Sequence, residues 1–315
     1  MGKYCCFLCP GKDYSEKTLD ALCPTCGRPY GFPLTQRPDT IREYRVLESR
    51  DRGFYASTYL CTRGRLDKKY ILKVSPELVY KYFTKNFAEE CSIHRDVAEG
   101  TEHIVPINDF FDLPIVFGDQ TIECHVAVID FVDGPSLRQF LEKPGSLNVR
   151  SVAQIAIDLF RIRREFVNKL KYHNDLDADN IIIQLLSEDT RRAESIDDLI
   201  RAVAIDLGSD SDDSKSDACD GRLGDQHWLA SHLQLMVGKL REARAEIDSM
   251  DDLDIRLSET LERIVNVLLP PVTSARSPSA DNLMRIVRDE FFRVNTYSPW
   301  KTPLNEILPK NWTGV

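Results

Sequence analysis

The sequence predicts an α+β protein with a β-rich first half, a helical second half and a small cysteine-rich unit in front of both. Short runs of β-branched and aromatic residues, separated by turn residues, predict an antiparallel meander at residues 44–47, 55–62 and 69–74. Apolar residues recur at helical spacing over 151–171 and over most of 231–294. Two C-x-x-C pairs lie close together near the N-terminus.

The composition of the 315-residue chain is that of an ordinary globular protein, with 42% hydrophobic and 29% charged residues. Its net charge of -9 argues against nucleic-acid binding, which usually needs a basic face. No apolar run approaches the ~20 residues of a membrane-spanning helix, so we expect no membrane association. The chain has nine cysteines, an odd number, and their clustering in C-x-x-C pairs near the N-terminus suits metal binding in a reducing compartment better than a disulfide framework. We therefore expect a cytoplasmic protein.

The cysteine-rich unit has the spacing of a zinc site. Two residues between thiolates let both sulfurs face one ion while backbone N–H groups turn toward them. The unit resembles a zinc ribbon over residues 1–35, which implies four zinc ligands: Cys6, Cys9, Cys23 and Cys26. Cys5 is an alternative member of the first pair, and iron is an alternative metal on ligand softness. A closed four-cysteine site implies structural zinc, and we place the ribbon with a Pro-rich linker at residues 1–38.

A lysine and a glutamate in the β-rich half form a candidate ion pair. Lys73 lies between apolar residues on the expected strand Tyr70–Val74. Residues 80–99 have helical periodicity, and at about 100° per residue Glu90 falls on the apolar face of this helix, whereas Glu89 points away. A carboxylate on that face needs a cation, and Lys73 is the natural one.

A polar loop, His173–Asn180, is the most informative stretch of the second half. Asp and Asn residues crowd it, and three isoleucines follow directly, so we expect the loop at the mouth of a buried strand, residues 181–185. A second apolar strand, residues 202–205, ends at Asp206. Asn180 and Asp206 thus both emerge at the ends of paired strands, where oxygen ligands suit a hard cation such as Mg2+.

These features together resemble the protein-kinase superfamily. His173-x-Asp175-Leu176, followed by Asn180, is similar to the catalytic loop of that family. Asp206-Leu207-Gly208 resembles its D-F-G motif, and the strand that carries Lys73 resembles its V-A-I-K strand. The resemblance covers about residues 40–295. It implies a bilobal fold, with a β-rich N-lobe at residues 39–130 and a helical C-lobe with a tail at residues 131–315.

The resemblance also implies the site residues of an ATP- and Mg2+-dependent phosphotransferase. Asp175 would accept the proton of the attacking hydroxyl group. Asn180 and Asp206 would bind Mg2+, and Lys73, paired with Glu90, would clamp the ATP phosphates. The expected cofactors are ATP, Mg2+ and Zn2+.

The implied nucleotide site includes a turn and a hinge. The turn Asp51–Ala56 lies where the family has a glycine-rich loop, and of its glycines only Gly53 is kept. Two further strands are expected at residues 104–107 and 126–129. The second runs into the stretch that resembles the hinge, whose backbone groups bind adenine: Asp130, Phe131 and Val132.

Several departures from the family leave three alternatives open. A divergent Ser/Thr protein kinase is favoured by the hinge, by the Lys73 and Glu90 pair, and by the zinc ribbon, which could dock a protein substrate or partner. A small-molecule kinase of the aminoglycoside or choline type is favoured by Asn174, which replaces an arginine, and by the absence of A-P-E from the acidic segment 209–222. A pseudokinase scaffold is favoured by the depleted glycine loop and by Asp177, which stands where Ser/Thr kinases carry a lysine.

Overall fold

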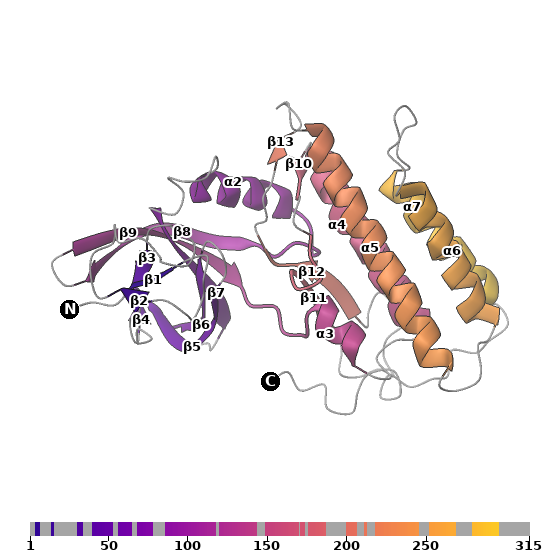
Figure 1. Cartoon of the computed structure of the whole chain (residues 1–315), viewed down its shortest axis with the longest axis horizontal. Coiled ribbons are helices and arrows are strands. Elements are labelled where there is room, and N and C mark those ends of the chain that lie inside the picture. The colour runs from indigo at the N-terminus through magenta and orange to yellow at the C-terminus, as the bar shows by residue number, and fades with distance from the viewer. Residues whose placement is uncertain are drawn as a thin grey trace. The chain divides into compact units, whose positions relative to one another are not determined.

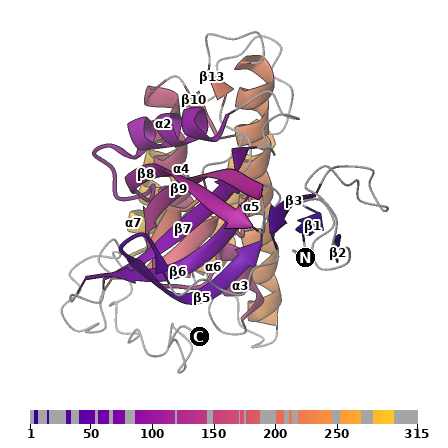
Figure 2. The same ribbon diagram turned by 90° about the vertical axis from the view of Figure 1, so that its left-hand side faces the viewer.

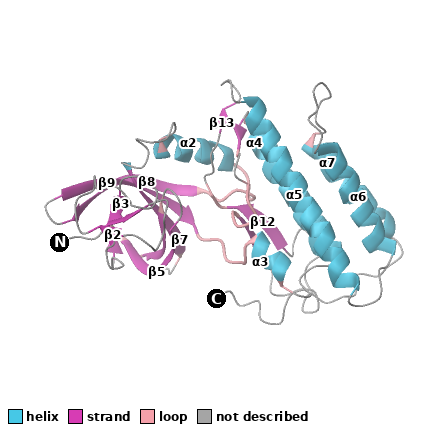
Figure 3. Cartoon of the chain, in the orientation of Figure 1, coloured by secondary structure: helices cyan, strands magenta, loops and turns pink. Residues whose placement is uncertain are grey.

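The computed structural model describes residues 4–6, 14–15, 30–33, 40–52, 56–64, 68–77, 86–117, 120–143, 149–169, 171–173, 176–186, 200–206, 211–212, 218–245, 252–268 and 279–295. This part of the chain combines α and β structure, as predicted, with a curled antiparallel sheet and six helices (Figure 3). The chain divides into two compact units. The first comprises Met1–Arg95 and Pro106–Phe131, and the second comprises Asp96–Val105 and Val132–Val315.

An antiparallel six-stranded sheet dominates the first unit, in the order β4-β5-β6-β7-β9-β8 (Figure 2). Its strands are β4 (Thr40–Ile41), β5 (Tyr44–Arg52), β6 (Ser57–Arg63), β7 (Lys69–Pro76), β8 (Ile107–Phe117) and β9 (Gln120–Asp130). The predicted meander of β5, β6 and β7 is confirmed. Leu72 on β7 and Val126 and Val128 on β9 are fully buried, because these two strands lie inside the sheet.

Two predicted strand boundaries are wrong. The turn expected from Asp51 begins later, because Asp51 and Arg52 still pair with β6. The strand expected at residues 104–107 is instead β8, most of which lies further along the chain. Ile104 makes only an isolated bridge to Ala204, within the second unit. Pairing with β9 along its whole length positions β8, and the local apolar run does not reveal that pairing.

Helix α2 (Phe87–Ala98) is shorter than the helix predicted over residues 80–99. Asn86 is not helical, and its side-chain oxygen accepts a hydrogen bond from the Ala88 N–H at 2.7 Å. Asn86 therefore caps α2, and the prediction of one continuous helix is wrong at this residue. The helix lies beside β8, where the rings of Phe87 and Phe110 are 5.9 Å apart (Figures 1 and 2).

A small antiparallel sheet in the order β2-β1-β3 forms near the N-terminus, from β1 (Tyr4–Cys6), β2 (Tyr14–Ser15) and β3 (Tyr30–Pro33). Cys6 belongs to β1, but its side chain is not among those described. Cys9, Cys23 and Cys26 lie outside the described residues. The zinc ribbon therefore stays a prediction.

Helices dominate the second unit: α3 (Leu137–Glu142), α4 (Val149–Asn168), α5 (Ala218–Ala245), α6 (Asp252–Leu268) and α7 (Ala280–Asn295). Helix α4 packs against α5 and α7, and α6 packs against the same two helices (Figure 1). The helices predicted over 151–171 and 231–294 are confirmed in type: α4 ends at Asn168, and α5, α6 and α7 cover nearly all the described residues of the second range. Helix α5 begins at Ala218, inside the acidic segment 209–222.

Two short β-pairs complete the second unit. Strands β11 (Ile181–Leu185) and β12 (Ile200–Ala204) are antiparallel, as are β10 (Lys171–Tyr172) and β13 (Ser211–Asp212). The segment Asp96–Val105 groups with these elements, although it lies within the predicted N-lobe range of 39–130. Among the described helices, none is long and apolar enough to cross a membrane.

Candidate active site

The hairpin of β11 and β12 brings the two predicted Mg2+ ligands to one place. Ile181 pairs with Ala204 in antiparallel register. The Ile205 N–H donates to the Asn180 carbonyl at 2.9 Å and extends the ladder by one step. Asn180 and Asp206 therefore lie at the same end of the hairpin, and both are half-buried. Their predicted position at paired strand ends is confirmed, while their role in metal binding stays a prediction.

His173 fixes the start of the polar loop. Its backbone N–H donates to Asp225 Oδ2 on α5 at 3.0 Å, and its Nε2 lies 3.2 Å from the Asp206 carbonyl oxygen. Because a carbonyl only accepts, Nε2 of this ring is the donor in the contact. The Phe166 ring packs edge-on against the imidazole at 5.2 Å. His173 thus ties the loop to α5 and to Asp206, the second residue after β12. Asp175 itself lies outside the described residues.

The second part of the loop is held by side chains from α5 and α3. His232 Nε2 on α5 lies 2.6 Å from the Leu176 carbonyl oxygen. Burial lowers the pKa of His232 and outweighs the effect of this hydrogen bond, so the ring is neutral at pH 7 and donates from Nε2. Arg138 on α3 donates from Nη2 to Asp177 at 2.9 Å and from Nε to Asp179 at 2.7 Å. The described residues of the loop are therefore anchored at both ends.

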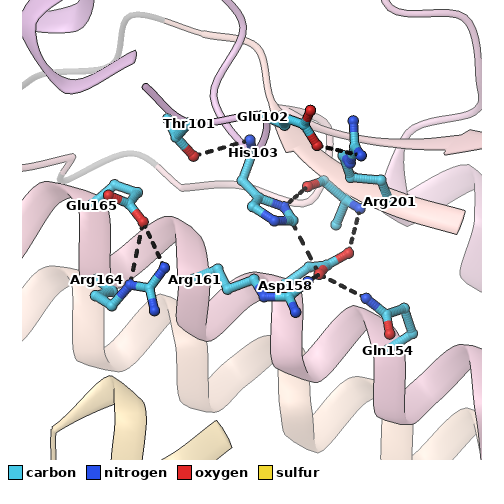
Figure 4. Close-up of polar contacts among 10 residues, drawn as sticks. Thr101, Glu102, His103, Gln154, Asp158, Arg161, Arg164, Glu165 and Arg201 are labelled. Carbon is cyan, nitrogen blue, oxygen red and sulfur yellow. Dashed lines mark hydrogen bonds and ion pairs between the residues drawn. The ribbon is translucent and has the colours of Figure 1, made fainter. Parts of the chain in front are cut away.

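A buried carboxylate on α4 holds β12 in place. Asp158 is 0% exposed and accepts hydrogen bonds from the Ala202 N–H at 2.9 Å, from Gln154 Nε2 at 2.8 Å and from Arg161 Nη1 at 2.9 Å (Figure 4). His103 Nδ1 lies 3.2 Å from the Ala202 carbonyl oxygen and 3.8 Å from Asp158 Oδ1. Burial also lowers the pKa of His103. This network fixes the strand that leads to one of the two predicted Mg2+ ligands.

The segment 101–105 pairs with the other edge of β12. The Val105 N–H donates to the Ala204 carbonyl at 2.9 Å, and the Ala204 N–H donates to the His103 carbonyl at 2.9 Å. Glu102 forms an ion pair with Arg201 at 2.5 Å (Figure 4). Strand β12 is therefore held by β11 on one edge, by this segment on the other, and by Asp158 from α4.

Lys73 and Glu90 are both placed in the first unit. Lys73 on β7 pairs in register with Thr58 and with Ala127, and it is half-buried between fully buried neighbours. Glu90 lies in the first turn of α2 and is half-buried, whereas Glu89 is exposed. The predicted orientation of the two glutamates is confirmed. The ion pair between Lys73 and Glu90 stays a prediction.

The hinge-like residues end β9. The Asp130 N–H donates to the Pro106 carbonyl at 3.3 Å, and the Phe131 N–H donates to the Lys69 carbonyl at 3.4 Å. These two N–H donors are thus bonded within the first unit, while adenine binding by Asp130, Phe131 and Val132 stays a prediction. The Asp130 carboxylate binds Lys68 at 2.8 Å, a hydrogen bond that raises the pKa of Lys68. Gly53, the predicted phosphate-loop residue, lies outside the described residues.

Comparisons with known proteins assign no family. No protein-family model matches the chain, and no curated protein is significantly similar to it in sequence. Within the described residues, no group of three or more His, Cys, Asp or Glu could hold a metal ion, and the side chains of the four predicted zinc ligands are not among those described.

Sequence reasoning missed the residues that hold the loop and the hairpin: Arg138, Asp158, Asp225 and His232. Asp225 and His232 carry a weak signal, because residues seven apart lie on the same side of a helix about two turns along. Two polar residues on the buried side of a core helix usually have polar partners. Arg138 has no comparable local signature, since Asp177 lies 39 residues away. Asp158 has Gln154 and Arg161 nearby on its own helix, but the strand residue that it holds, Ala202, lies 44 residues away.

Proposed function

We propose that this chain is an ATP- and Mg2+-dependent phosphotransferase of the protein-kinase type, whose acceptor is a serine or threonine hydroxyl group. The observation that carries this proposal is the common position of Asn180 and Asp206 at one end of the hairpin, with His173 bonded to the Asp206 carbonyl. An amide oxygen and a carboxylate at one place suit a hard cation that keeps several water ligands.

Each step of phosphate transfer has a candidate residue. Asp175 would accept the proton of the acceptor's hydroxyl group. The hydroxyl oxygen then bonds to the γ-phosphorus, and ADP leaves. Asn180 and Asp206 would hold Mg2+, which neutralises charge on the phosphate oxygens when it is bound. Lys73, supported by Glu90, would bind the α- and β-phosphates. Gly53 and Val132 would contact the phosphates and the adenine through their backbones.

A protein acceptor is supported by the predicted zinc ribbon. A closed zinc site has no open coordination position for chemistry, so its role in an enzyme is structural. A ribbon joined to a phosphotransferase would serve to dock a protein substrate or partner. The reducing environment that four zinc-bound thiolates require agrees with a cytoplasmic location.

Transfer from labelled ATP tests this proposal. The chain is incubated with ATP and Mg2+, with a generic protein substrate and, separately, with an amino sugar or choline. Asp206→Ala is compared with Asp281→Ala, whose carboxylate is 71% exposed and pairs only weakly with Arg164, at 3.3 Å. Label on protein that Asp206→Ala abolishes and Asp281→Ala leaves unchanged supports the proposal. Turnover with a small acceptor alone would assign a small-molecule kinase, and ATP binding without turnover would assign a scaffold.

A further inference from the structure

The start of α3 is pinned against the polar loop and β11. Ser136 caps the helix through a capping box with Gln139, and it forms an antiparallel bridge to Ile182. The Ile183 N–H donates to the Pro135 carbonyl at 2.9 Å. One residue into the helix, the Arg138 N–H donates to the Ala178 carbonyl at 3.2 Å. Backbone contacts alone therefore fix the position of Arg138 relative to the loop, independently of its side chain.

The Arg138 guanidinium then bridges two carboxylates of the same turn. Nε donates to Asp179 Oδ2 at 2.7 Å, and Nη2 donates to Asp177 Oδ1 at 2.9 Å. Asp177 Oδ1 also accepts the Asp179 N–H at 2.9 Å, and the Asp177 carbonyl accepts the Asn180 N–H at 3.0 Å. A planar guanidinium can satisfy two acceptors at fixed geometry, which a single ammonium group cannot. Arg138 thus holds the turn that ends at a predicted Mg2+ ligand.

Arg138 also compensates the charge of Asp177. The Asp177 side chain is 27% exposed, compared with 57% for Asp179, so solvent screens Asp177 less. Asp177 Oδ1 accepts hydrogen bonds from the Asp179 N–H and from the Arg138 guanidinium, which is the arrangement of an ionised carboxylate. Without Arg138, this anion would stand uncompensated two residues from Asp175, where negative phosphate has to approach.

We infer that Arg138 is a positioning residue of this site, which fixes the turn Asp177–Asn180 and cancels the charge of Asp177 during phosphate transfer. The inference rests on the proposed function. Its electrostatic part and its structural part are separable, because Asp177→Asn keeps a side-chain oxygen that can accept the Asp179 N–H and removes the charge.

Four variants of the full chain test the inference: Arg138→Ala, Arg138→Lys, Asp177→Asn, and the double variant Arg138→Ala/Asp177→Asn. Arg241→Ala is the matched control, because Arg241 is equally exposed, at 46%, and forms an ion pair with Glu262 at 2.6 Å. The readouts are kcat, KM for ATP at several Mg2+ concentrations, and backbone hydrogen exchange over residues 176–180.

Arg138→Ala should lower kcat by about tenfold or more, since an uncompensated anion near a phosphoryl group opposes transfer. It should also speed hydrogen exchange in the turn. The kcat and the hydrogen-exchange rate of Arg138→Lys should lie between those of Arg138→Ala and the wild type. Adding Asp177→Asn to Arg138→Ala should restore most of the lost kcat, which a purely structural role of Arg138 would not allow. Arg241→Ala should change none of these values.

Two outcomes would overturn the inference, and they are distinguishable. If the wild type transfers phosphate and Arg138→Ala has the wild-type kcat, or if the double variant is no better than Arg138→Ala, then Arg138 does not act through Asp177. If the wild type transfers no phosphate to any acceptor, the proposed function fails, and the positioning role fails with it. In that case hydrogen exchange still shows whether Arg138 holds the turn.

Discussion

Asp158→Ala provides the sharpest test of how the second unit is held together. The carboxylate is 0% exposed and accepts from the Ala202 N–H, from Gln154 and from Arg161, all within 2.9 Å. The substitution removes the acceptor and leaves these donors in the place they occupy now. Gln154 is buried, and the Arg161 side chain is 17% exposed, so water reaches them poorly.

The expected loss follows from these contacts. A buried donor that loses its acceptor costs about 1–3 kcal/mol, and breaking a buried ion pair by removing one partner costs about 3–5 kcal/mol in total. We expect Asp158→Ala to lower the free energy of unfolding by about 3–5 kcal/mol. With a urea m-value of about 2 kcal/mol/M, the unfolding midpoint should fall by roughly 1.5–2.5 M. Asp158→Asn should be milder, because its oxygen still accepts the Ala202 N–H.

Urea unfolding followed by circular dichroism measures this loss. Asp281→Ala is the control, since its carboxylate is 71% exposed and an exposed pair contributes about 0–1 kcal/mol. A loss of less than about 1 kcal/mol for Asp158→Ala would refute the reasoning. It would mean that the three donors find other acceptors or water, and that Asp158 does not hold β12.

Two further predictions concern the same unit. Gly134→Ala should destabilise it by about 1–3 kcal/mol, because a Cβ at this position would lie 2.2 Å from the Ile183 carbonyl oxygen. Gly238→Ala, in open space on α5, should be neutral or stabilising. Chemical denaturation measures the stability of both variants, and equal stabilities would contradict the packing at Gly134. The free energy of unfolding should also fall as the pH drops below about 6.5, because burial lowers the pKa of His232 in the folded state and the unfolded chain therefore takes up the proton first. His232→Gln should flatten this dependence between pH 7 and 5 by up to about 1.4 kcal/mol per pH unit, and an unchanged slope would show that His232 is protonated in the fold.

Local pattern predicted much of the secondary structure. Alternating and continuous apolar residues placed β6, β7, β9, β11 and β12, because a half-buried or buried strand needs such residues whatever lies beside it. Helical spacing placed α4 for the same reason. It also distinguished Glu90 from Glu89, since about 100° per residue separates neighbouring side chains on a helix.

Local pattern failed where a partner decides the structure. The apolar run at residues 104–107 has the composition of a strand, yet Ile104 and Val105 pair with Ala204 in the second unit, and of the four residues only Ile107 belongs to the sheet of the first. Asn86 lies inside the helix predicted over residues 80–99, but its side chain instead accepts the Ala88 N–H and caps the start of α2. In both cases the sequence is compatible with either structure, and hydrogen bonds to another segment make the choice.

The sequence by itself determined that Asn180 and Asp206 stand at strand ends, because the change from an apolar run to polar residues marks where a buried strand ends. Only the tertiary structure decided that both ends meet in one hairpin and that Arg138, Asp158, Asp225 and His232 hold it. These side chains form hydrogen bonds with residues that lie 39 to 56 positions away along the chain. Such contacts depend on how helices pack, and packing is a property of the whole apolar core that no local stretch encodes.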